Sequence, residues 1–165
     1  MRLAPAALAL ALSACATVPH DAGHPEARKA FTTSLASDPA AELDAARSRA
    51  SADGKSVLLV MGANWCHDSR ALAGLLETPR FAALVEERYH LVFANVGMPQ
   101  TGDTHNLALA ARYGIDSLEG TPTVLVIGPD GKLQNADTAK TWRNAASRSA
   151  DAIHAELLAL SAAGG

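Results

Sequence analysis

The stretch at residues 56–69, SVLLVMGANWCHDS, limits the possible folds more than any other part of the chain. Its apolar run, VLLVM, has the length and composition of a strand that is buried on both faces of a sheet. A short loop follows, and Leu72, Leu75 and Leu76 then recur at the spacing of one helix face. The sequence therefore predicts a strand, a short loop and a helix that begins at Cys66.

Two readings are open for Cys66 at this position. The N-terminus of a helix carries partial positive charge and free N–H groups, which favour a thiolate over a thiol. Trp65 would shield one side of such a thiolate. A free cysteine can also be an inert, small apolar residue in a core. The placement after a buried strand favours the reactive thiol.

Two short motifs resemble the signatures of the thioredoxin superfamily. The segment WCHDS at 65–69 is similar to the active-site motif Trp-Cys-x-x-Cys, with Ser69 in place of the second cysteine. The segment GTPT at 120–123 is similar to the second signature, in which Pro122 would be in cis and face the cysteine. The resemblance extends over residues 39–159. It implies a thioredoxin-like three-layer α/β/α sandwich with a central mixed sheet, without the first strand of the full fold.

The resemblance also implies a mechanism, and the chain departs from it in two places. In the family, the first cysteine attacks a disulfide and the second releases the product. Here Cys66 would attack, favoured by a protonated His67 and opposed by the nearby carboxylate of Asp68. Ser69 can donate a hydrogen bond to the thiolate but cannot resolve a mixed disulfide, so an external thiol must do so. The family's buried carboxylate, which assists proton transfer, would stand at Val60.

Three function hypotheses follow. The first is a monothiol thiol–disulfide oxidoreductase or isomerase acting on cysteine-containing proteins or small thiols. The second is a non-catalytic module that binds polypeptides in a groove near Trp65 and Pro122, where the Thr121 backbone could pair with an extended segment. The third, a Cu(I) carrier, has only Cys66 and His67 as adjacent ligands. We favour the first, and predict no cofactor and no metal.

The plainer interpretations of these residues are packing for Trp65, solvent exposure for His67 and an ordinary trans peptide bond for Pro122. Cis bonds are a small minority before proline, and the Thr-Pro-Thr context favours cis here.

Residues 1–15 have the pattern of a bacterial lipoprotein signal peptide. Arg2 is followed by an apolar run at 3–12 that is too short to span a bilayer. The segment LSAC at 12–15 resembles a lipobox, which implies that Cys15 is lipidated; the alternative is an ordinary secretory leader. If lipid occupies Cys15, Cys66 has no intramolecular partner. Because Ala16 differs from the aspartate that retains lipoproteins at the inner membrane, we expect a lipid anchor at the periplasmic face of the outer membrane, in the cell envelope.

The rest of the chain divides into a tether at 16–37, with a brief helix possible at 26–35, and one domain at 38–165. A chain of 165 residues that is 48% hydrophobic can bury a single core. The net charge of −3 and the lack of a basic cluster give no support to nucleic-acid binding. We expect a monomer.

Within the domain, the first half is predicted to contain a helix at 38–52 with Asp38 as its cap, the strand at 57–61, the helix after Cys66, a helix at 80–88 and a strand at 90–96. A polar loop at 98–104 and a helix at 106–113, ended by Gly114, follow. The last part is predicted to contain a strand at 121–127, a turn at 129–131, an antiparallel edge strand at 132–136 and a final helix at 141–160.

Overall fold

The centre of the molecule is a mixed sheet of three strands. The computed structural model describes residues 24–26, 30–31 and 38–162. The strands lie in the order β2 (Tyr89–Asn95), β1 (Ser56–Gly62) and β5 (Thr123–Ile127). β1 runs parallel to β2 and antiparallel to β5. The apolar run that the sequence singles out is therefore the middle strand, hydrogen-bonded on both sides.

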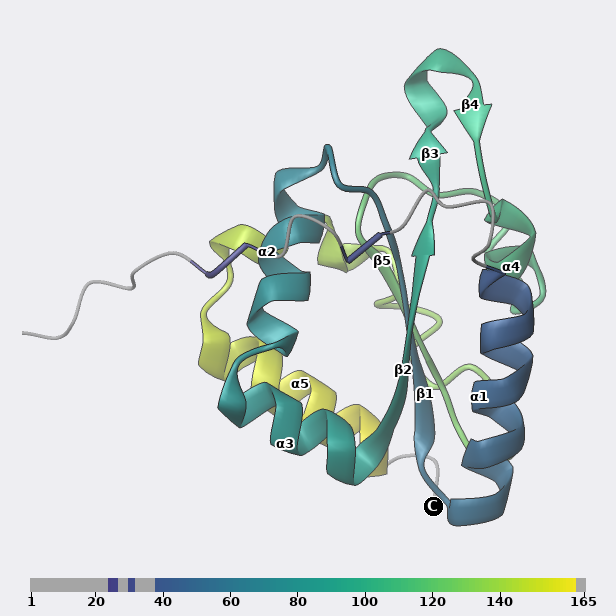
Figure 1. The fold of residues 1–165 in the computed structure, drawn as a ribbon, viewed down its shortest axis with the longest axis vertical. Helices are drawn as coiled ribbons and strands as arrows, with labels where there is room; N and C mark the ends of the chain where they lie inside the picture. Colours follow the sequence, from purple (N-terminus) through teal and green to yellow (C-terminus); the bar gives the residue numbers. More distant parts are fainter. Residues whose placement is uncertain (1–23, 27–29, 32–37, 163–165) are drawn as a thin grey trace, which may run out of the picture.

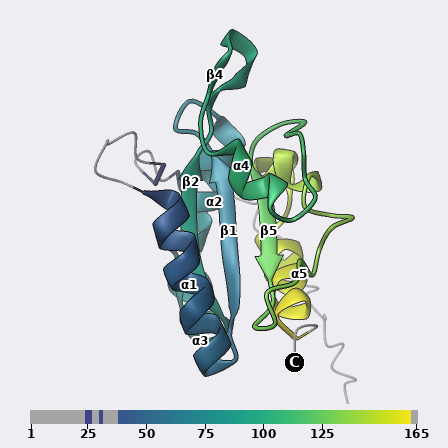
Figure 2. The same cartoon turned by 90° about the vertical axis from the view of Figure 1, so that its right-hand side faces the viewer.

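Helices cover both faces of this sheet (Figures 1 and 2). One face carries α1 (Pro39–Asp53) and the short α4 (Leu107–Ala111). The opposite face carries α2 (His67–Leu76), α3 (Pro79–Arg88), the 3₁₀ helix η2 (Thr141–Ser147) and α5 (Ala150–Ala162). The predicted three-layer α/β/α sandwich is confirmed. None of the helices in the described part of the chain is long and apolar enough to cross a bilayer.

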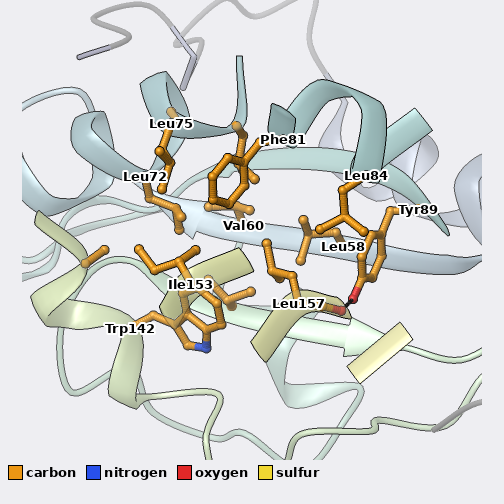
Figure 3. Close-up of a cluster of buried hydrophobic side chains, with 14 of the residues drawn as sticks. Leu58, Val60, Leu72, Leu75, Phe81, Leu84, Tyr89, Trp142, Ile153 and Leu157 are labelled. Atoms are coloured by element: carbon orange, nitrogen blue, oxygen red, sulfur yellow. Dashed lines mark hydrogen bonds between the residues drawn. The ribbon is translucent and has the colours of Figure 1, made fainter. Parts of the chain in front are cut away.

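Alternating side chains of β1 pack into two separate hydrophobic cores, one on each face of the sheet. Leu58 and Val60 face α2, α3 and α5, together with Trp142 of η2 (Figure 3). Val57, Leu59 and Met61 face α1 on the other side. Successive side chains of a strand point to opposite faces, so a central strand that is apolar at every position serves both cores. The Tyr89 hydroxyl donates to the Leu157 carbonyl at the rim of the first core (Figure 3); burial raises the pKa of Tyr89.

The start of α1 is as predicted. The Asp38 carboxylate accepts hydrogen bonds from the backbone N–H groups of Ala40 and Ala41, at 3.0 and 3.1 Å. Pro39 occupies the first turn, where no N–H is needed. At the other end Gly54 takes a left-handed conformation, with φ 78°, which glycine adopts without a steric cost.

The segment predicted as a polar loop at 98–104 is a small protruding hairpin instead. It consists of β3 (Gly97–Met98), a 3₁₀ turn η1 (Pro99–Thr101) and β4 (Asp103–Thr104). The hairpin rises above the sheet at the end where α2 begins (Figure 1). The helix that follows, α4, is shorter than predicted at both ends: Asn106 is left-handed, with φ 57°, and residues 112–114 form a turn.

The predicted edge strand at 132–136 is wrong. Only Leu133 pairs with β5, in a single antiparallel bridge to Ile127. Two residues later, the side chain of Asn135 takes the place of a strand: its Nδ2 donates to the Val124 carbonyl and its Oδ1 accepts from the Val126 N–H, both at 2.9 Å. An amide side chain carries the same donor and acceptor as a peptide group, so a fully buried Asn135 completes the hydrogen bonding of β5.

Replacing Asn135 by alanine should therefore lower the free energy of unfolding by about 2–4 kcal/mol, because a buried N–H and a buried carbonyl of β5 lose their partners. Urea denaturation monitored by circular dichroism measures this loss. Asn144→Ala, at an exposed position of η2, is the matched control and should change the stability by less than about 0.5 kcal/mol. Equal effects of the two substitutions would contradict a structural role for the Asn135 amide.

The predicted final helix at 141–160 is broken into two. Arg148 is extended, with φ −88° and ψ 147°, and Ser149 starts a new helix: its hydroxyl accepts from the Ala152 N–H at 3.2 Å. The guanidinium of Arg148 turns back over the ring of Trp142, 4.8 Å from its centroid. Ser149 is a helix-capping residue type, and it is the signal in the sequence for this break.

Part of the segment predicted as a tether packs on the domain. Phe31 is fully buried in the core on the α2 side. Its ring meets that of Phe93 edge-on, with centroids 5.2 Å apart. The leader at 1–15, including Cys15, lies outside the described residues, as does most of 16–37, including residues 32–35 of the possible helix at 26–35.

Candidate active site around Cys66

Cys66 lies where the sequence predicts, at the junction of the loop after β1 and the first turn of α2. It is the N-cap residue of α2, with extended φ and ψ of −81° and 123°. Its thiol is free and half-buried, and its carbonyl accepts from the Arg70 N–H at 3.1 Å. The thiol thus stands at the positive end of a helix of ten residues.

The loop before β5 faces this thiol. Cys66 Sγ donates a hydrogen bond to the Thr121 carbonyl at 3.2 Å, and the Thr121–Pro122 peptide bond is cis. Cys66 and the Thr121–Pro122 pair, 55 positions apart in the sequence, therefore meet in space. Thr121 is buried, and its carbonyl accepts the hydrogen bond from Cys66; its pairing with an extended segment stays a prediction.

Ser69 lies one helical turn after Cys66, but its hydroxyl points into the core. It is fully buried, and its Oγ has no hydrogen-bond partner among the described residues. A Cβ placed on Gly62 would come within 2.7 Å of both the Ser69 Oγ and the ring of Phe31. Gly62 thus leaves the space that Ser69 and Phe31 fill. The structure does not contain the hydrogen bond from Ser69 that was predicted for a Cys66 thiolate.

Trp65 is held against the β3–β4 hairpin. Its indole Nε1 donates to the Gly97 carbonyl at 2.7 Å, and 43% of the residue remains exposed. A hollow of about 180 Å³ opens beside it. The hollow is lined by Ala63, Asn64, Trp65, Asn95, Gly97, Met98, Asp103 and His105. Trp65, the residue before Cys66, therefore offers a partly exposed apolar surface beside this hollow.

His67 follows Cys66, and 65% of its side chain is exposed, yet it has a partner. Its Nδ1 lies 2.8 Å from Oε1 of Glu26, whose other oxygen accepts from Arg70 Nε at 3.0 Å. Hydrogen bonds from Arg70, and secondly from His67, lower the pKa of Glu26 below its ordinary value of 4.5. Because an ionised carboxylate only accepts, the Nδ1 of His67 carries the proton.

Arg70 connects this ion pair to the loop before Cys66. Its Nη1 donates to the carbonyls of Asn64 and Trp65, at 3.0 and 3.1 Å. The side chain of Asn64 in turn holds the backbone of Phe31 in both directions: its Oδ1 accepts from the Phe31 N–H at 3.2 Å, and its Nδ2 donates to the Phe31 carbonyl at 2.6 Å.

Sequence reasoning missed these four residues, Glu26, Phe31, Asn64 and Arg70. The one signal for the contact was Phe31, an aromatic residue in a chain with few of them.

Asp68 has a structural contact. Its Oδ1 accepts from the Ala146 N–H at 2.9 Å and thereby ties α2 to η2. Val60 is fully buried in the core beneath α2, at the position where a carboxylate would assist a second cysteine.

The described residues contain no group of three His, Cys, Asp or Glu side chains that could hold a metal ion. Met61, the nearest soft ligand in the sequence, is fully buried on the α1 side of the sheet.

Comparison with known proteins agrees with this fold. The thioredoxin-like family model matches residues 38–129, which include Cys66 and Pro122. The chain belongs to the thioredoxin-like family. The structure of this thioredoxin-like protein is similar to that of a disulphide isomerase from Xylella fastidiosa Temecula1, at 28% sequence identity and a TM-score of 0.69, over 79% of this chain and 96% of that chain.

A more distant similarity, at 15% identity and a TM-score of 0.40, is to a protein of unknown function from Pseudomonas aeruginosa, over 87% of this chain and 92% of that chain. No curated protein matches the chain.

Proposed function

We propose that this thioredoxin-like protein exchanges thiols and disulfides in the bacterial cell envelope by a monothiol mechanism. The observation that carries the proposal is the position of Cys66: a free, half-buried thiol at the N-terminus of α2, facing Thr121, with Ser69 where a second cysteine would stand. The disulphide isomerase from Xylella fastidiosa, 28% identical over most of the chain, supports this class of chemistry.

The exchange would have two steps. First, Cys66 gives up its hydrogen bond to Thr121, loses its proton and attacks one sulfur of a partner disulfide. A bond forms between Cys66 Sγ and that sulfur, the partner's S–S bond breaks, and the leaving thiolate takes up a proton. Second, the thiolate of an external thiol attacks the partner's sulfur and releases Cys66 as a thiolate. Over both steps no electrons are gained or lost, and the disulfide has only changed partners.

The flanking residues would support the first step. The N–H groups at the start of α2 favour the thiolate, and a protonated His67 adds positive charge next to it. The exposed face of Trp65 would contact the partner beside its cysteine. The partners that fit are proteins with accessible disulfides or small disulfide molecules.

A lipid on Cys15 would hold the protein at the periplasmic face of the outer membrane. One lipid-bearing residue, without a spanning helix, would keep the domain in the aqueous space where disulfides persist.

A second candidate function is a polypeptide-binding module without redox turnover. The hydrogen bond from Cys66 to the Thr121 carbonyl favours it, because this bond occupies the thiol that would otherwise attack a partner. The hollow beside Trp65 would then take a side chain of the bound polypeptide.

Reaction with a small aromatic disulfide separates the two candidates. In a Cys15→Ser chain, where Cys66 is the only thiol, we expect one mixed disulfide per folded molecule, seen as a single mass increment. The adduct should persist until an external thiol is added, because Ser69 cannot release it. Cys15→Ser/Cys66→Ser is the blank. A Cys66 that reacts only after the protein is unfolded in urea would contradict thiol–disulfide exchange and favour the binding module.

A further inference from the structure

Glu26 reaches the first turn of α2 from a segment that the sequence separates from the domain. Its two carboxylate oxygens contact His67 Nδ1 at 2.8 Å and Arg70 Nε at 3.0 Å. The residue lies at the surface, and 26% of its side chain remains exposed. His67 directly follows Cys66 in the chain, so Glu26 binds the residue next to the thiol that the proposed function makes the nucleophile.

Arg70 passes this contact on to the loop that ends at Cys66. One of its terminal nitrogens donates to the carbonyls of Asn64 and Trp65, the two residues before the thiol. Its Nε is bound by Glu26. The guanidinium is therefore held from two sides, between Glu26 and the loop that leads into α2.

Contacts of nearby residues also hold Glu26 at this position, independently of its own ion pairs. Phe31, a few residues later, is fully buried, and the Asn64 side chain binds its backbone N–H and carbonyl. On the other side, His24 Nε2 lies 2.7 Å from the Arg148 carbonyl. A substitution of Glu26 alone therefore leaves the segment seated through its neighbours, and the effect of the carboxylate can be measured by itself.

We propose that Glu26 is a positioning residue for Cys66: through Arg70 and His67 it orders the first turn of α2 and offsets the positive charge there, and so sets the pH range in which Cys66 reacts. The inference rests on the proposed function, since it concerns the reactivity of that thiol. Glu26 itself touches no reacting atom, because its contacts are to the side chains of His67 and Arg70.

The charges around Cys66 decide the direction of the effect. They belong to His67, Asp68 and Arg70 on α2, Glu26 on the docked segment, and Glu119 and Arg143 beside the Thr121 loop. Glu119 is itself paired with Lys140 and Arg143. With its pKa below the ordinary value, Glu26 is fully charged near neutral pH. Removing this charge leaves Arg70 unopposed next to the thiol, which favours the thiolate.

The test is the rate of Cys66 alkylation by iodoacetamide as a function of pH, in the full chain carrying Cys15→Ser. Glu26→Gln should move the whole rate profile to lower pH by roughly half a unit, which is about a threefold faster reaction on its rising limb. Arg70→Gln should move the profile in the opposite direction by a similar amount, because it removes the cation.

Asp44→Asn is the matched control. It breaks a carboxylate–arginine pair with Arg112, at 2.9 Å, on the opposite face of the sheet, and should leave the profile in place. Thermal unfolding verifies that each variant is folded at the assay temperature. Profiles that stay in place, or that shift in the same direction for Glu26→Gln and Arg70→Gln, would overturn the positioning role while leaving a reactive Cys66. A thiol that is unreactive in the unsubstituted chain would instead overturn the proposed function, and the inference with it.

Discussion

Replacing Phe31 by alanine should lower the free energy of unfolding by about 3–5 kcal/mol, the usual cost of removing a fully buried aromatic ring. Phe31 has no exposed surface and belongs to the core that joins β1, α2 and α5. Its ring packs edge-on against Phe93 and fills the space left open by Gly62. The loss would arise from the lost apolar contacts and from the cavity beneath the first turn of α2.

Urea denaturation of the full chain measures this effect, with Phe31→Leu as the matched control. Leucine keeps most of the apolar volume, so its cost should be below about 1.5 kcal/mol. If the segment before Asp38 were only a tether, Phe31→Ala would act as a surface substitution, within about 0.5 kcal/mol of the unchanged chain. Such a result would contradict the docking of Phe31.

Ser69→Cys should shorten the lifetime of a mixed disulfide on Cys66 by at least about a hundredfold. The substitution places a second thiol one helical turn after the first, in the pattern Trp-Cys-x-x-Cys. An intramolecular thiol has a far higher effective concentration than any thiol in solution, so the adduct would be released and a disulfide would form within the chain. Mass spectrometry of the Cys15→Ser chain after reaction with a small disulfide follows both species.

Ser69→Ala is the control for this experiment, since it removes the hydroxyl without adding a thiol. The adduct on Cys66 should persist in Ser69→Ala as it does with serine. Because the Ser69 hydroxyl is buried without a partner among the described residues, its loss should leave the stability unchanged or raise it by about 1 kcal/mol. An adduct that is equally long-lived in Ser69→Cys would show that the new thiol does not reach Cys66, and would refute release by a neighbouring thiol.

The sequence was sufficient where local pattern and burial agree. The strand at β1, the loop and the helix beginning at Cys66 follow from an apolar run and a leucine spacing, and the cap of α1 follows from Asp38 and Pro39. These features depend on residues close together in the chain. The second signature, at Thr121 and Pro122, was found by resemblance, and it does meet Cys66.

The remaining features depend on contacts that no local sequence pattern predicts. Glu26 and Phe31 reach the site through hydrogen bonds to Arg70 and Asn64, across about forty and thirty positions of the chain; their segment has no periodicity of its own. The side chain of Asn135 makes the hydrogen bonds to β5 that a neighbouring strand would make, so the alternation of residues expected of an edge strand is missing. Propensities for helix and strand describe backbone conformation, whereas the docking of Glu26 and Phe31 and the covering of β5 by Asn135 both depend on side chains.

The covering of β5 has a consequence for the association of one molecule of this protein with another. A strand at the border of a sheet normally presents free N–H and carbonyl groups, to which a strand of another molecule can add and start aggregation. In β5 the N–H of Val124 donates to the Ala139 carbonyl, its carbonyl accepts from Asn135, and both groups of Val126 are bonded to residues 134 and 135. These backbone groups of Val124 and Val126 are therefore not free to pair with a strand of another molecule. At high protein concentration, this edge of the sheet should not start edge-to-edge association.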